Sequence, residues 1–265
     1  MGDLEESLAL ERIGPDLLGA RADPNFEGNG AMFGGWTAAL LTKAALSVSA
    51  PGQSVLSLTI HFLKRVPAGS ALRVKTQCLR HGRSLSHWRC ELVVDDDSSV
   101  AVSAHVILGQ RVRTECYQDL PMPKTSGPEG LRSTEVVFPC FKIIETRFES
   151  GEKWFSGGST SSLIWAKFSS PASLDAPRLA FLSDISPPRS FYVMEEPRPT
   201  PTIMMTLNIF AIEAELMESS GQFVLCEMRG TRMEESSSGA VGRIWSRNGK
   251  LLATTEQLQW SPPSQ

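Results

Sequence analysis

Residues 31–49 read AMFGGWTAALLTKAALSVS, and the stretch ends at Ala50-Pro51-Gly52. Alanine and leucine favour helices, and no proline interrupts these residues. The proline and glycine that follow break a helix. The stretch therefore predicts a buried helix that stops before Pro51.

Four strand-like runs follow this helix, separated by short turns rich in glycine, proline or aspartate. They cover residues 54–64, 71–80, 84–94 and 99–109. We expect them to form a four-stranded antiparallel meander.

The same order occurs a second time. Residues 173–191, SLDAPRLAFLSDISPPRSF, predict another helix, with Pro187-Pro188 forcing its end or a kink. Strand-like runs then resume at residues 202–216, 222–235, 240–248 and 250–260. A long buried helix followed by an antiparallel sheet that can wrap it, present twice, predicts an α+β fold.

The two halves are separated by a segment rich in proline, glycine and charge, which includes PMPKTSGPEG at residues 121–130. Two strand-like pieces, 136–149 and 161–168, come after it. We expect an N-terminal domain over residues 1–115, a linker over 116–135 and a C-terminal domain over 136–265.

Composition excludes several classes of function. The formal charge of −3 and the pI of about 5.9 provide no basic field for nucleic acid. No apolar run approaches the roughly 18 residues of a membrane span. The first fourteen residues, MGDLEESLALERIG, lack the features of a secretory signal, so a cytoplasmic location is expected.

The cysteines and histidines show no pattern of a metal or redox site. The five cysteines are odd in number, widely spaced and without a Cys-x-x-Cys pair. Phosphate-binding loops, dinucleotide motifs and nucleophile elbows are also missing from the sequence. We expect no cofactor and no metal, and cysteines that are reduced and buried for packing.

Three short motifs in the first half resemble one known family. Phe33-Gly34-Gly35-Trp36 looks like the family's Phe-Gly-Gly-Gln, and residues 61–67 are similar to its Tyr-Phe-Leu-Arg-Pro strand. Residues 80–86 are similar to its Arg-Asp-Gly-Asn-Ser-Phe-Ser turn. With the repeated order of elements, the chain resembles acyl-CoA thioesterases of the thioesterase II type. The resemblance implies a double hotdog, in which a continuous antiparallel sheet wraps two long central helices.

The resemblance also implies a catalytic set. Residues 180–184 look like the family's Ala-Tyr-Ala-Ser-Asp, which gives Asp184 the role of the catalytic aspartate. Thr206 matches the threonine of Thr-Ile-Asp-His, and Gln257 matches the glutamine of Gln-Glu-Gly. In the family these three residue types orient a water that attacks the thioester carbonyl.

The match at these positions is incomplete. Asn208-Ile209 stands where the family has Asp-His, and Leu258-Gln259 stands where it has Glu-Gly. Thr206 could also satisfy local backbone groups, and Gln257 could face solvent. An exposed or capping aspartate is the alternative at Asp184.

Three further residues are candidates for substrate binding. Gly34 and Gly35 would expose backbone N–H groups at a helix start, where they can stabilise an oxyanion. Tight packing is the alternative, which the sequence favours for Gly34. Arg83 could contact the substrate or face water.

The expected function is hydrolysis of acyl-CoA or another acyl thioester in fatty acid metabolism, by a homodimer. One alternative is an enzyme of a specialised pathway that hydrolyses, cyclises or dehydrates a carrier-bound or polyketide-like acyl group. Another is a non-catalytic acyl-binding protein.

Overall fold

The computed structural model describes residues 3–95, 97, 99–171 and 173–262. The chain divides into two compact units. The first comprises Met1–Cys116, Val136–Ile143 and Asp175–Phe181, and the second comprises Tyr117–Glu135, Ile144–Leu174 and Leu182–Gln265.

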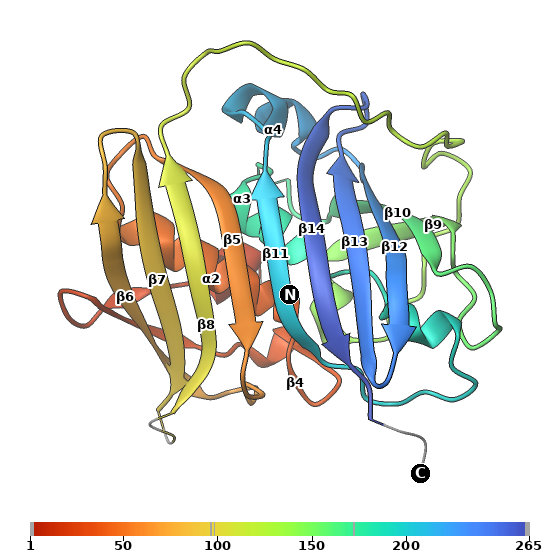
Figure 1. Cartoon of the computed structure of the whole chain (residues 1–265), viewed down its shortest axis with the longest axis horizontal. Coiled ribbons are helices and arrows are strands. Elements are labelled where there is room, and N and C mark those ends of the chain that lie inside the picture. Colours follow the sequence, from red (N-terminus) through yellow and green to blue (C-terminus); the bar gives the residue numbers. More distant parts are fainter. Residues whose placement is uncertain (1–2, 96, 98, 172, 263–265) are drawn as a thin grey trace. The chain divides into compact units, whose positions relative to one another are not determined.

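The first unit is built on helix α2 (Gly34–Val48) and the strands that follow it (Figure 1). These are β5 (Ser54–Phe62), β6 (Ala71–His81), β7 (Leu85–Val94) and β8 (Val100–Gly109). The predicted helix and all four predicted strands are confirmed. Two short strands of the same sheet come earlier in the chain, β1 (Glu11–Arg12) and β2 (Leu17–Arg21), and β2 pairs with β6.

The strand order β6-β7-β8-β5 differs from the expected meander. The strands β6, β7 and β8 follow one another through hairpins, but β5 pairs with β8 instead of β6. Alternating hydrophobicity determines which face of a strand is buried, whereas it does not determine the neighbouring strand. The prediction of a four-stranded meander was therefore wrong for β5, its first strand.

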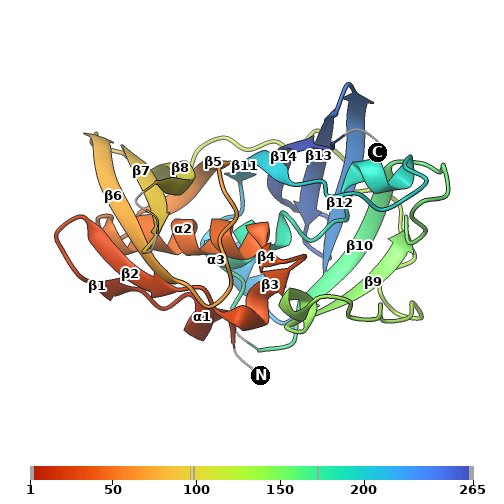
Figure 2. The same ribbon diagram turned by 90° about the horizontal axis from the view of Figure 1, so that it is seen from below.

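Helix α2 is covered by the sheet of its own unit (Figure 2). Ten of its fifteen residues are buried, which include Trp36, Leu40 and Leu41. A helix that is apolar nearly all round belongs in a protein core. Smaller elements complete the first unit: α1 (Leu4–Ser7), η1 (Pro24–Phe26), β3 (Glu27–Gly28), β4 (Ala31–Met32) and η2 (Pro139–Phe141).

The second unit contains six antiparallel strands in the order β11-β14-β13-β12-β10-β9 (Figure 1). Their bounds are Ile144–Ser150 for β9, Ser161–Phe168 for β10, Thr202–Ile209 for β11, Val224–Glu234 for β12, Ser237–Trp245 for β13 and Leu251–Trp260 for β14. As in the first unit, the opening strand of the series pairs with the last one, here β11 with β14.

Helix α4 (Glu213–Ser219) forms where the strand after residue 202 was expected to continue to residue 216. The Glu215 carboxylate accepts a hydrogen bond from the backbone N–H of Ile212 at 3.1 Å. This bond caps the first turn of a segment rich in helix-forming residues.

The second predicted helix is short. Helix α3 (Ala176–Leu182) has seven residues, and a turn at Ser183 and Asp184 ends it. The 3-10 helix η3 (Arg189–Tyr192) follows Pro187-Pro188. The helix ends several residues before the two prolines, which prevent an α-helix from resuming there because each lacks an N–H group and restricts the residue before it. The expectation of two long central helices is therefore met only by α2.

The segment between the two sets of strands has no helix or strand from residue 110 to residue 138. It is nevertheless packed against the second unit. Met122 and Leu131 contact a buried cluster formed by Trp165, Phe223, Leu225 and Trp245. Among the residues that the structure describes, no helix is both long and apolar enough to span a bilayer.

Candidate active site

Asp184 and Gln257 are in direct contact within the second unit. The Gln257 side chain donates from Nε2 to Asp184 Oδ1 at 3.1 Å and to the Ser183 carbonyl oxygen at 3.0 Å. Gln257 is 3% exposed, and Asp184 is half-buried. A carboxylate that is partly open to solvent is thus held beside a buried amide.

Strand alternation explains the position of Gln257. In β14, Thr255, Gln257 and Gln259 are buried, while Glu256 and Leu258 are exposed. Successive side chains of a strand point to opposite faces, so the three polar residues share the inner face. Gln257 was predicted either as catalytic or as solvent-facing, and the solvent-facing alternative is wrong.

Thr206 lies on the other face of β11. Met205 is the cross-strand partner of Gln257, and Thr206 is the partner of the exposed Glu256. The inner-face position is occupied by Met205, whose sulfur accepts a hydrogen bond from Ser183 Oγ at 3.4 Å. The expected convergence of three residues therefore holds for Asp184 and Gln257 but not for Thr206.

Two residues that the sequence did not single out extend the polar group. Gln259 Nε2 donates to Gln257 Oε1 at 3.3 Å and to Thr202 Oγ1 at 3.5 Å. Thr202 is the register partner of Gln259, and a shift in register separates it from Met204. Gln259 lies two residues after Gln257, so strand alternation in the sequence could have placed both on one face. The position of Thr202 beside Gln259 depends on a shift in register, which the sequence does not reveal.

The inner face also carries polar atoms with no hydrogen-bond partner in the described part of the chain. They are Thr255 Oγ1, Gln259 Oε1 and Ser238 Oγ. All three residues are at most 5% exposed. Buried polar groups without partners are costly, so a polar row of this kind is expected where water or a ligand can bind.

The remaining predicted site residues belong to the first unit. A Cβ atom on Gly35 would lie 2.5 Å from the Phe181 carbonyl oxygen, so tight packing accounts for this glycine. Gly34 is the first residue of α2 and is half-buried. Arg83 is exposed in the turn between β6 and β7. None of the three belongs to the Asp184–Gln257 contact.

Two of the buried cysteines are poor candidates for nucleophiles. Burial raises the pKa of Cys90 and of Cys226 to about 12, so both thiols stay protonated near neutral pH. Cys140 is also buried. Cys78 and Cys116 are exposed, which corrects the expectation that all five cysteines are buried.

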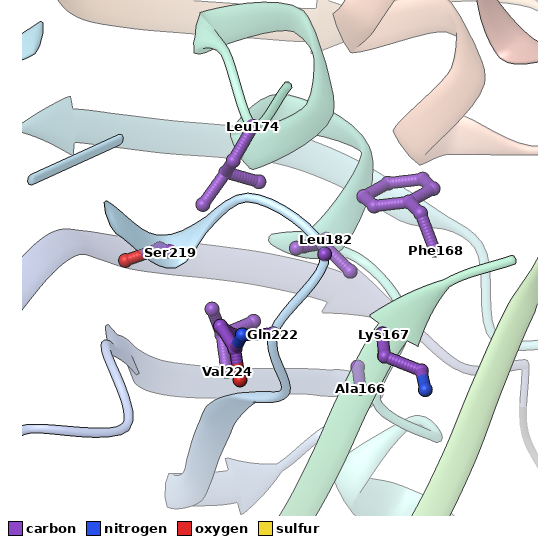
Figure 3. A pocket seen from close by; sticks show the side chains of 9 residues that line it. Ala166, Lys167, Phe168, Leu174, Leu182, Ser219, Gln222 and Val224 are labelled. Atoms are coloured by element: carbon purple, nitrogen blue, oxygen red, sulfur yellow. The ribbon is translucent and has the colours of Figure 1, made fainter. Parts of the chain in front are cut away.

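A small hollow lies beside the end of α3 (Figure 3). Leu174 and Leu182 line it together with Phe168 and Val224. Its volume of about 10 Å³ is close to that of a single water site. The hollow is therefore too small for an acyl chain.

Comparison with known proteins defines the class of this protein as a thioester hydrolase. The sequence matches the model of the acyl-CoA thioesterase N-terminal domain over residues 22–109 and that of the acyl-CoA thioesterase C-terminal domain over residues 118–260. The chain belongs to the acyl-CoA thioesterase family. No curated protein sequence matches the chain significantly.

Solved structures show the same hotdog fold. A protein of unknown function from Alicyclobacillus acidocaldarius is 23% identical, with a TM-score of 0.92 over 99% of this chain and 98% of that one. The acyl-CoA thioesterase II TesB2 from Mycobacterium marinum is 19% identical, with a TM-score of 0.81 and 99% of each chain covered. A putative thioesterase from Novosphingobium aromaticivorans is 21% identical, with a TM-score of 0.82 over 96% and 99% of the two chains.

Proposed function

We propose that this protein hydrolyses acyl-CoA thioesters, with Asp184 as the base that activates the attacking water and Gln257 as the residue that positions Asp184. The observation that supports this most directly is the 3.1 Å contact between Gln257 Nε2 and Asp184 Oδ1. The family resemblance at residues 180–184 points to the same aspartate.

The reaction needs no covalent intermediate. A carboxylate has about four acceptor positions, so the bond from Gln257 is compatible with a second one from water. Asp184 takes a proton from this water, and the hydroxide forms a bond to the thioester carbonyl carbon. The C–S bond then breaks, and the proton passes to the leaving thiolate. The products are a free acid and free CoA thiol.

The orientation of Gln257 is fixed from both ends. Its nitrogen is directed to Asp184, and its oxygen accepts a bond from Gln259 at 3.3 Å. Because these two bonds already hold the Gln257 side chain in one orientation, little side-chain entropy is lost when substrate binds. The amide N–H group therefore stays directed at the Asp184 carboxylate.

The test is thiol release from a panel of acyl-CoA substrates of different chain lengths. Asp184→Asn is expected to lower kcat by about 10²–10⁴-fold, which is the usual contribution of a general base. Asp119→Asn is the matched control, because Asp119 is exposed in the segment without helices or strands. Turnover by Asp184→Asn at the wild-type rate would remove Asp184 from this role.

A second pair of variants tests the positioning by Gln257. In Gln257→Glu, a second negative charge beside Asp184 makes its ionisation harder, so the acidic limb of the pH–rate profile should move to higher pH. Gln257→Ala should lower kcat at every pH. Thr206→Val should retain kcat within about twofold, because Thr206 lies on the opposite face of β11 and outer-face substitutions usually have small effects.

A further inference from the structure

A pocket of about 490 Å³ lies in the second unit between η3 and the hairpin that joins β12 to β13. Its volume is within the range of small-molecule sites. It is distinct from the hollow beside α3, and neither Asp184 nor Gln257 lines it. The residues that line it include a buried cation.

That cation is Arg189, which is 3% exposed and lines the pocket. Its Nη1 group donates to Ser162 Oγ at 2.9 Å and to the carbonyl oxygens of Thr160 at 3.2 Å and Met228 at 3.4 Å. Its Nε group donates to the Pro187 carbonyl oxygen at 3.0 Å, and Nη2 donates to the same oxygen. The guanidinium also packs over the ring of Tyr192, 4.7 Å from its centroid.

All of these protein partners are uncharged. No carboxylate of residues 3–95, 97, 99–171 or 173–262 forms an ion pair with Arg189. A guanidinium stays positively charged, and the carbonyl and hydroxyl oxygens around Arg189 bring no full negative charge to balance it. A buried charge without a counter-charge is costly, so an anion that enters the pocket would be stabilised.

A second polar group lines the same pocket. Ser238 is 2% exposed, and its Oγ atom has no hydrogen-bond partner in the described part of the chain. Its hydroxyl can donate to an anion. The pocket thus combines a buried cation with a buried hydroxyl that lacks a partner.

The other residues that line the pocket limit which kind of anion can bind there. Val193 and Met233 add apolar surface, and Arg232 forms an ion pair with Glu234. Glu234 and Glu235 place two negative charges at the pocket. Two glutamates would repel the several charges of the CoA polyphosphate more strongly than a single carboxylate, and the apolar wall suits an acyl chain that ends in one such group.

A row of polar side chains connects the pocket with the candidate active site. Ser238 is the cross-strand partner of Gln259, which donates to Gln257. Two residues along a strand span roughly 7 Å and neighbouring strands lie about 5 Å apart, so Ser238 lies roughly 8–9 Å from Gln257. That separation suits the two ends of one short acyl group.

We infer that this pocket binds a carboxylate on the acyl part of the substrate through Arg189 and Ser238, so that the preferred substrates are thioesters of dicarboxylic acids. This inference rests on the proposed thioester hydrolysis. The competing role for Arg189 is purely structural, a clamp that holds η3 against β10 through the Ser162 hydroxyl and against β12 through the Met228 carbonyl oxygen.

The experiment compares matched substrates that differ only at the far end of the acyl chain. Adipoyl-CoA and hexanoyl-CoA have the same number of carbons, as do suberoyl-CoA and octanoyl-CoA. A charge-assisted hydrogen bond contributes about 1.5–3 kcal/mol, so kcat/KM should favour the dicarboxylic member of a pair by about tenfold or more. Equal kcat/KM values within both pairs would overturn the inference.

Variants separate substrate recognition from a structural clamp. Arg189→Met and Ser238→Ala should bring the ratio of kcat/KM within each pair close to one, through a rise in KM for the dicarboxylic member. Arg229→Met and Ser237→Ala are matched controls, because both residues are exposed and absent from the pocket lining. A ratio unchanged in Ser238→Ala and in a folded Arg189→Met would assign Arg189 to the clamp. If Arg189→Met does not fold, the ratio of kcat/KM measured with Ser238→Ala still tests the inference.

A binding measurement distinguishes failure of the pocket from failure of the proposed function. Titration calorimetry on Asp184→Asn should show that adipoyl-CoA binds at least about tenfold more tightly than hexanoyl-CoA, as one charge-assisted bond predicts. If wild-type protein releases no thiol but this preference is present, the pocket stands and the reaction is wrong. If thiol is released without any such preference, the reaction stands and the pocket assignment is wrong.

Discussion

At the residue scale, Gly35 illustrates how close packing can require a residue without a side chain. A Cβ atom there would lie 2.5 Å from the Phe181 carbonyl oxygen and 2.5 Å from Cε1 of Phe33. Phe33 and Phe181 already pack edge to face, with ring centroids 5.1 Å apart. There is no space for a methyl group, so glycine at this position is required by packing alone.

Gly35→Ala should therefore lower the free energy of unfolding by about 1–3 kcal/mol, the usual cost of overpacking a core. Gly158→Ala is the matched control, because the nearest atom to its Cβ would be Ser156 Oγ at 3.6 Å. Chemical denaturation of both variants measures the difference. Equal stability of Gly35→Ala and wild type would contradict the close approach.

At the element scale, the short helix α3 determines where Asp184 lies. The Asp175 carboxylate accepts from the backbone N–H of Arg178 at 2.8 Å and from its guanidinium. This arrangement caps the start of the helix, and the turn after Leu182 places Asp184 at its end. Burial raises the pKa of Asp175, so the buried Arg178 is its main compensation.

Asp175→Ala should lower the free energy of unfolding by about 1–2 kcal/mol through loss of the cap, while Asp3 at 3.9 Å and Glu5 at 4.0 Å remain as counter-charges of Arg178. It should also lower kcat, because the turn that carries Asp184 becomes less ordered. Asp16→Ala, at an exposed position before β2, serves as the control for loss of a carboxylate in the first unit. Thermal unfolding and thiol release on the same samples check both effects.

At the scale of the whole molecule, buried thiols make the free energy of unfolding depend on pH in the alkaline range. The pKa of Cys90 and that of Cys226 are each about 12 in the folded protein, against 9.0 for an ordinary thiol. Between these values the unfolded chain loses protons that the folded chain retains. The folded state therefore binds more protons, and stability falls as the pH rises from 9 towards 12.

The expected slope is up to about 1.4 kcal/mol per pH unit for each thiol. Urea unfolding between pH 8 and pH 10.5 should show a smaller decline for Cys226→Ala than for wild type. Cys78→Ser is the control, because Cys78 is exposed and should leave the decline unchanged. An identical slope in Cys226→Ala and wild type would show that Cys226 does not remain protonated in the folded state.

The sequence by itself determined the helix at residues 34–48, the positions of most strands and the family, because local propensity, alternation and short motifs depend on neighbouring residues. It also named Asp184 and Gln257 as candidate site residues, and the structure shows that they are in contact. Only the tertiary structure decided that β5 pairs with β8, that Thr206 faces away from Gln257, and that Thr202 and Gln259 extend the polar row. The physical reason is that strand pairing and register are long-range properties: one residue of shift exchanges the faces of a strand, and the letters of a single strand do not reveal it.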